Sequence, residues 1–348
     1  MAAIREARPQ LLIPCDDRGV QHAHELHARA LSEGAAGAAI AALIERSLGV
    51  PESYPIVSSR YLLLKIAREE GICVPETKAI DSTSDLESLY PGPVASWVLK
   101  ADGTFGGTGV RIARTREQAL KTFAELSRPY RMLRVLERLV VDRDPFYLRP
   151  WWKKEQPAVI AQAHVQGQPA NCAVACWEGE ILAAISAEVV GAIDATGPAG
   201  VVRIVENPAM SLAAKKLASR LSLSGFFGLD FMIEDATRVP YLIEMNPRGT
   251  PLCHLRFGGR RDLIGTLWTK LSGEPMRDVC PIIPNDVIAY FPRAWKHNRD
   301  LLHSSYQDIP QDDPELIAAL LRPWPSRTLL FRLRQVLAAA YTARKSSR

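Results

Sequence analysis

The sequence predicts an α+β fold, in which short strands joined by tight turns alternate with amphipathic helices. Three observations predict it. Two apolar runs, residues 231–233 and 241–243, flank a polar turn, as in a β-hairpin. Further apolar runs meet at turn glycines, Gly167 and Gly179. Helical patterns with capping residues, such as the one that begins at residue 60, separate these strands.

Composition places the chain among ordinary globular proteins. Of its 348 residues, 47% are hydrophobic and 23% are charged. We expect a cytoplasmic protein without a transmembrane segment, because no apolar run approaches about 20 residues and the six cysteines are scattered. Residues 1–315 hold 36 of the 43 bases and all 38 acids, so the net charge of +5 comes from the C-terminal end. The body of the protein is therefore not expected to bind nucleic acid.

The N-terminal segment predicts a partial α/β unit. Residues 10–14 have the pattern of a short buried strand, and helices follow up to about Arg29 and over residues 37–48. The run Ser58-Ser59-Arg60 is the expected cap of a helix that continues to Glu70. We divide the chain into a partial N-terminal region, two central subdomains and a helical, basic C-terminal extension, with bounds 1–76, 77–160, 161–275 and 276–348.

A glycine-rich loop follows the strand predicted at residues 94–100. It leads into a second strand at residues 110–113 and lacks the Lys-Ser/Thr pair of a Walker A loop, so it fits neither that motif nor the dinucleotide fingerprint. Its backbone could still cradle phosphate oxygens, which Lys100 could also reach. A flexible hairpin tip is the alternative. The loop residues concerned are Gly103, Thr104, Gly106, Gly107, Thr108 and Gly109.

The second half continues this alternation. Strands are predicted at residues 158–165, 171–176, 180–190 and 287–291, and helices at residues 211–221 and 262–271. A loop that could act as a lid is predicted at residues 191–200. Residues 327–341 have an apolar stripe at helical spacing. We predict that this basic helix docks on the protein's own body; a contact with an anionic membrane surface or a partner is the alternative.

The chemistry concentrates on the hairpin. If its turn centres near Thr237, Asp230 lies opposite Glu244 with Cβ atoms about 5 Å apart, and Asn246 faces the same way. Two carboxylates and an amide oxygen suit Mg²⁺. A surface hairpin with incidental acids fits less well, because Glu244 stands between apolar Ile243 and Met245. Since the acids repel without a metal, we expect Glu244→Gln to raise the stability of the metal-free protein slightly.

In their order and spacing, these features resemble the ATP-grasp superfamily, which includes biotin carboxylase, carbamoyl-phosphate synthetase and D-alanine–D-alanine ligase. The resemblance covers about residues 55–275. Its most specific part is Asp230 together with Glu244-Met-Asn-Pro-Arg248, supported by Val98-Leu-Lys100 and Gly106-Gly-Thr-Gly109. The chain departs from many relatives in having Gln162 in place of a glutamate, and in its short N-terminal region.

The resemblance implies an ATP-grasp fold of two α+β subdomains that clasp MgATP. Lys100 would contact the α-phosphate, and the glycine loop would cover the β- and γ-phosphates. Arg248 and Lys100 are the catalytic candidates. The resemblance also implies adenine contacts from Gln162, Ala163, His164 and Val165, and Arg60 as a further cofactor-binding residue. It implies that Asp230, Glu244 and Asn246 are the ligands of two Mg²⁺ ions, with Mn²⁺ as an alternative.

The implied activity is that of an ADP-forming ligase, which activates a small-molecule carboxylate as an acyl phosphate for attack by an amine. A carboxylase or kinase-like enzyme with another acceptor is one alternative, and a non-catalytic protein that binds ATP or a partner is another. A homodimer is compatible with the sequence.

Overall fold

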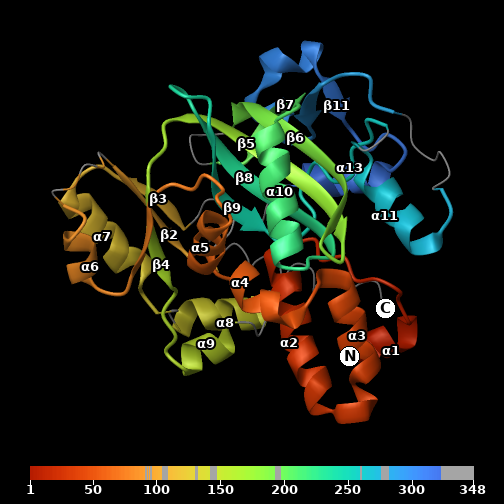
Figure 1. Cartoon of the computed structure of the whole chain (residues 1–348), viewed down its shortest axis with the longest axis horizontal. Helices are drawn as coiled ribbons and strands as arrows, with labels where there is room; N and C mark the ends of the chain where they lie inside the picture. Colours follow the sequence, from red (N-terminus) through yellow and green to blue (C-terminus); the bar gives the residue numbers. More distant parts are fainter. Residues whose placement is uncertain are drawn as a thin grey trace, which may run out of the picture.

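The computed structural model has two β-sheets, each flanked by helices (Figure 1). It describes residues 1–322 apart from 91, 93, 95, 104–108, 130–131, 142–146, 193–196, 259–260 and 276–281. The helix predicted at residues 327–341 therefore lies outside the described residues. The α+β class is confirmed. Within the described part of the chain, no helix is both long and apolar enough to cross a bilayer.

Among the described residues of the N-terminal region the regular elements are helices, and residues 10–14, where a strand was predicted, form an irregular link between α1 and α2. No strand forms at residues 10–14, because the N–H of Leu12 bonds to Ser47 Oγ (2.9 Å), and Pro14 has no N–H to give a neighbouring strand. Ile13 is 51% exposed, so the run is not buried either. The helices are α1 (Ala2–Ala7), α2 (Asp17–Ser32), α3 (Ala38–Leu48), α4 (Tyr54–Val57) and α5 (Arg60–Glu69). Of the predicted capping run, Ser59 is the residue that caps α5.

The smaller sheet is antiparallel, with strand order β1-β4-β2-β3. Helices α6 (Thr83–Glu87) and α7 (Arg116–Leu126) pack on it, and its core includes Trp97, Leu99 and Phe123. Helices α8 (Met132–Val141) and α9 (Leu148–Trp152) follow along the chain. The strands are β1 (Thr77–Ile80), β2 (Trp97–Ala101), β3 (Val110–Ala113) and β4 (Val159–Ala163), so the proposed boundary at residue 160 falls inside β4.

The larger sheet has the strand order β11-β10-β7-β6-β5-β8-β9. Strands β10 and β11 come from the segment after residue 275, so its described part is not solely helical but completes this sheet. Strand β7 was not predicted. Because β6 ends at Ala192 and β7 begins at Ala199, only residues 193–198 of the expected lid lie between strands, and residues 193–196 lie outside the described residues. The bounds are β5 (Gly167–Trp177), β6 (Glu180–Ala192), β7 (Ala199–Val205), β8 (Gly225–Glu234), β9 (Pro240–Asn246), β10 (Val287–Tyr290) and β11 (Tyr306–Asp308).

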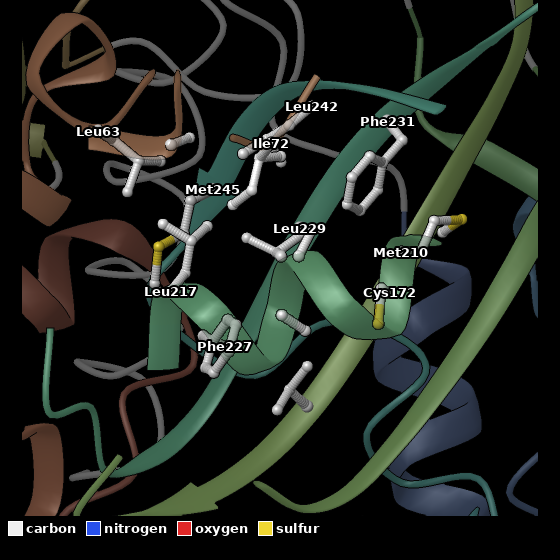
Figure 2. Close-up of a cluster of buried hydrophobic side chains, with 14 of the residues drawn as sticks. Leu63, Ile72, Cys172, Met210, Leu217, Phe227, Leu229, Phe231, Leu242 and Met245 are labelled. Carbon is white, nitrogen blue, oxygen red and sulfur yellow. The ribbon is translucent and has the colours of Figure 1, made fainter. Parts of the chain in front are cut away.

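Alternate residues of β5 serve two cores on the two faces of this sheet. Cys172 and Val174 pack with helices α5 and α10 (Pro208–Arg220), whereas Ala173 and Ala175 pack on the side of α11 (Leu263–Ser272). Figure 2 shows the first core, where Leu217 of α10 meets residues of β8 and β9. This packing fixes the hairpin that carries the acids. Two short helices, α12 (Arg293–His297) and α13 (Pro314–Leu321), complete the described chain.

Candidate functional site

One cavity of about 600 Å³ collects most of the residues that the sequence singled out. Its wall draws on both sheets, on α2 and α5, and on the segment after β10. Gly109 is described but is not part of the wall, and the glycine-loop residues Thr104, Gly106, Gly107 and Thr108 lie outside the described residues. The predicted residues that line the cavity are Arg60, Lys100, Gly103, Gln162, Ala163, His164, Val165, Asp230, Glu244, Asn246 and Arg248.

The hairpin places Asp230 directly opposite Glu244, as predicted from the sequence. The register then shifts, since Phe231 pairs with Leu242, and this leaves Ile243 as an extra residue in β9. The bulge lets Leu242 and Met245 both enter the core, where they are 0% and 6% exposed (Figure 2). Glu244 can therefore face the cavity although its sequence neighbours are apolar.

Asp230 is held in a buried, acidic setting. Its carboxylate accepts hydrogen bonds from the side-chain amides of Asn171 and Asn246, the latter at 2.9 Å. Burial and, next, the charge of Glu244 raise the pKa of Asp230 to about 6, although the hydrogen bonds from Asn171 and Asn246 act in the opposite direction. Asn171, on the neighbouring strand β5, is a hydrogen-bond partner of this carboxylate that the sequence did not predict.

Arg60, at the wall of the cavity, connects the two sheets. Its guanidinium donates to Glu244 Oε1 (2.7 and 3.2 Å), to the carbonyl of Ala101 (2.7 Å) and to Asp102 Oδ1 (3.3 Å). The side chain is 13% exposed. Arg60 thus neutralises Glu244 from one side, and Asp102 is a site residue that the sequence did not indicate.

Lys100 reaches across from β2 to the bulge. Its Nζ donates to the carbonyl of Ile243 at 3.1 Å, the residue that the bulge leaves out of the regular register. Lys100 is 4% exposed, and burial lowers its pKa to about 8 although nearby Glu244 acts in the opposite direction. A cation with this little hydration is well placed to bind an anionic ligand in the cavity.

The segment after β4 lines the cavity with backbone groups. The N–H groups of Ala163 and His164 bond to the carbonyls of Glu76 (2.7 Å) and Ser96 (3.0 Å). Among the residues that the structure describes, no acceptor faces the N–H of Val165. This N–H is therefore available to a ligand in the cavity.

Arg248 ties the end of the hairpin to α2. Its Nε donates to Asp17 Oδ2 (3.0 Å), and its terminal nitrogens donate to Asn246 Oδ1 (3.0 Å) and to the carbonyl of Gly249 (3.2 Å). The Arg248 and Asp17 side chains are 22% and 23% exposed, so the ion pair is accessible from the cavity. Asp17, far away in sequence, was not predicted as part of the site.

Further residues of the wall carried no signal in the sequence. Gln21 lines the cavity from α2, and its Oε1 is buried without a donor among the described residues. Tyr290 and Arg293 line it from β10 and α12. They come from the segment that the sequence had separated as an extension, which is why a local pattern could not find them.

Comparisons with known proteins agree with this architecture. A family model described as an ATP-grasp domain matches residues 144–251. No curated protein sequence matches the chain. Among solved structures, the biotin carboxylase domain of Hydrogenobacter thermophilus 2-oxoglutarate carboxylase, in complex with MgADP, ADP and bicarbonate, aligns with a TM-score of 0.54 at 13% identity, over 79% of this chain and 56% of that one.

The Campylobacter jejuni biotin carboxylase complex gives a TM-score of 0.53 at 13% identity, over 76% of this chain and 56% of that one. At this identity the likeness shows the fold, and the chain spans little more than half the length of these structures. Residues 144–251 thus match an ATP-grasp domain, and the chain has the fold of these biotin carboxylase structures. The sequence resemblance is thereby confirmed.

Proposed function

We propose that the chain is an ATP- and Mg²⁺-dependent ligase that activates a carboxylate as an acyl phosphate and joins it to an amine. The observation that carries the proposal is the cross-strand pair of Asp230 and Glu244 at the cavity wall, within the matched domain. Lys100, Arg248 and Val165 line the same cavity. This set supplies cations, metal ligands and a backbone donor in one enclosure.

The donor set fits a hard divalent cation. Two opposed carboxylates in a buried setting repel each other, and a cation between them would remove that repulsion. Asp230, Glu244 and the amide oxygen of Asn246 would hold Mg²⁺, or Mn²⁺ in its place, and the family pattern implies two ions. Bound Mg²⁺ would neutralise the phosphate charge. Asn246 Oδ1 accepts from Arg248 in the structure, so this amide oxygen already points toward a positive charge.

The chain's own residues would position the reactants. Lys100 would hold the α-phosphate, the loop at residues 103–109 would cover the outer phosphates, and Val165 N–H would donate to the adenine. The substrate carboxylate attacks the γ-phosphorus and ADP leaves; the amine then attacks the acyl carbon, phosphate leaves, and the amine's proton passes to solvent. Arg248 would stabilise the charge that develops at the transferred group, and the cavity would exclude water.

The direct test is ADP release in the presence of MgATP and a screen of amino acids and small carboxylates. The expected result is acceptor-stimulated ADP release that requires Mg²⁺ and is absent in Glu244→Gln. Glu234→Gln is a matched control on the same hairpin, since Glu234 is not part of the cavity wall and bonds to Thr237 in the turn.

Nucleotide binding is measured separately, as the rise in melting temperature on adding MgATP. Binding without ADP release under any acceptor would show a non-catalytic ATP-binding protein and refute the ligase. The absence of any shift at millimolar MgATP would refute the nucleotide site itself.

A further inference from the structure

The helices α8 and α9 expose apolar side chains to solvent, away from the cavity. They follow α7 along the chain, contact each other and lie at the edge of the molecule near α2 (Figure 1). None of their described residues lines the cavity. The proposed phosphoryl transfer therefore leaves this pair of helices, which we call the α8–α9 surface, without a task.

One side of α8 is an apolar stripe. Met132, Leu136 and Val140 follow one another at intervals of four residues, so they lie on the same side of the helix. They are 53%, 44% and 65% exposed, whereas Val135 on another side is buried. A contiguous apolar stripe that stays in contact with water is typical of a surface that binds something else.

Helix α9 adds an aromatic side chain to this surface. Trp152 is 78% exposed, the highest value among the large hydrophobic side chains of the described residues. Its ring meets that of Trp151 edge to face, with the ring centres 6.3 Å apart. An indole is apolar over most of its surface and carries one N–H donor, so it is suited to the boundary between an apolar phase and water.

Contacts with the body of the protein hold the two helices in place. Tyr147, directly before α9, accepts a hydrogen bond at its hydroxyl from Arg18 of α2 (3.0 Å). The guanidinium carbons of Arg18 and of Arg138 on α8 lie 5.1 and 5.9 Å from the centre of the Tyr147 ring. Tyr147 thus links both helices to α2, and these contacts fix which side the helices present to solvent.

Positive charge accompanies the exposed apolar residues. Residues 128–157 hold eight bases and four acids, although residues 1–315 together hold 36 bases and 38 acids. Arg149, Lys153 and Lys154, on α9 or directly after it, are exposed. Lys153 lies 4.0 Å from Glu155, and an exposed pair of this kind neutralises little charge. The α8–α9 surface therefore suits a partner that is both apolar and negatively charged.

This charge argues against two other occupants of the surface. Residues 323–348, which lie outside the described residues, hold six bases and no acid, so they would bring positive charge to positive charge. A second copy of the chain that met the α8–α9 surface through its own α8–α9 surface would do the same, because a two-fold interface sets like patches against each other. An anionic partner of another kind remains.

We propose that the α8–α9 surface binds an anionic lipid bilayer. The apolar stripe and Trp152 enter the boundary between headgroups and acyl chains, while Arg149, Lys153 and Lys154 stay among the lipid phosphates. The protein then lies on the membrane without crossing it. This inference does not depend on the proposed ligase activity, because none of the residues that it uses belongs to the nucleotide site.

The test is co-sedimentation of the full chain with vesicles made of equal parts of phosphatidylcholine and phosphatidylserine, compared with vesicles of phosphatidylcholine alone. We expect binding to the mixed vesicles, much weaker binding to the neutral ones, and a loss of binding as salt is added. Trp152→Ser should weaken binding about tenfold or more, since it removes the largest exposed apolar side chain of the surface. The double variant Lys153→Gln/Lys154→Gln should weaken it about tenfold as well.

Two control variants match these changes elsewhere on the protein. Trp268→Ser removes an exposed indole from α11, and Lys65→Gln/Lys215→Gln removes two exposed lysines from α5 and α10. Both should bind the mixed vesicles as the wild type does, and the melting temperature of each variant shows that it is folded.

Four results would overturn the inference. They are no binding of the wild type to the mixed vesicles, equal binding to neutral vesicles, an undiminished response in both surface variants, and an equal loss in the controls. Undiminished binding would place the lipid contact elsewhere on the chain. Concentration-dependent self-association that Trp152→Ser abolishes, without vesicle binding, would assign the surface to a second copy instead.

Discussion

Replacing Glu244 by glutamine tests the hairpin assignment most informatively, because the structure changes what the sequence led us to expect. Sequence reasoning considered only the repulsion between Glu244 and Asp230. In the structure, Arg60 donates two hydrogen bonds to Glu244 Oε1, at 2.7 and 3.2 Å. Both effects must be weighed for the metal-free protein.

The repulsion that the substitution relieves is limited. The pKa of Asp230 stands at about 6 against 3.8, and burial is the larger cause of this shift. The whole net shift corresponds to about 3 kcal/mol, and Glu244 is the smaller of its two raising causes, so that relieving the repulsion gains on the order of 1 kcal/mol. Hydrogen bonds to charged groups contribute about 1.5–3 kcal/mol, and glutamine keeps the acceptor oxygen but loses the charge, so that about 2 kcal/mol is lost. We therefore expect Glu244→Gln to be slightly destabilised, by about 1 kcal/mol.

The assay is chemical denaturation in the presence of a chelator, together with ADP release. Glu244→Gln should lose about 1 kcal/mol of unfolding free energy, which corresponds to about 2–4 °C in melting temperature, and it should lose turnover. Glu234→Gln should do neither. Increased stability of the metal-free variant would show that repulsion outweighs the Arg60 contact, and wild-type turnover would refute the role of Glu244 as a metal ligand.

Three further predictions concern the other charged residues of the cavity. Because burial raises the folded-state pKa of Asp230 to about 6, the metal-free protein holds this proton more tightly than the unfolded chain, so its stability should fall as pH rises from about 4 through 6. Unfolding measured across this range should show the decline in the wild type and not in Asp230→Asn; equal profiles would contradict it. Burial lowers the pKa of Lys100 to about 8, so we expect the affinity for MgATP, measured by calorimetry, to fall above that pH. Lys100→Met should remove both this affinity and its pH dependence. Lys78→Met, the control, should remove neither. Arg248→Ala should raise the barrier to turnover by about 3 kcal/mol while MgATP affinity stays within a few-fold, and Arg248→Lys should rescue only part of it; a parallel collapse of affinity would make Arg248 a nucleotide ligand instead.

The hairpin could be predicted because its information is local. Alternating apolar residues around a polar turn set the register, and this was enough to place Asp230 opposite Glu244. The bulge at Ile243 carries no comparable signal. It reflects the packing of Leu242 and Met245 against α5 and α10, which a single strand's pattern cannot reveal.

Residues joined over long sequence separations escaped prediction for the same reason. Arg60 was assigned to the site, but its contact with Glu244, 184 residues away, was not foreseen. Asp17 and Gln21 looked like the surface of an ordinary helix. The strand predicted at residues 10–14 was wrong because an apolar run forms a strand only beside a sheet edge, and here helices take that place.

The division of the chain was limited by topology. Strands β10 and β11 join β7 in the larger sheet, so a boundary at residue 275 separates parts of one sheet. Strand β10 was predicted at residues 287–291, but its pattern did not show which sheet it joins, and the three-residue β11 was not predicted. Arg293 enters the cavity only through that pairing.

The central claim is that Asp230 and Glu244 hold the metal of a bound nucleotide. A crystal structure of the full chain with ADP and Mn²⁺, with the metal located by its anomalous scattering, tests it most directly. We predict a metal peak bonded to oxygens of both carboxylates at about 2.0–2.2 Å, with the phosphates toward Lys100 and the adenine beside Val165. A nucleotide bound elsewhere, or a metal that contacts neither carboxylate, would contradict it.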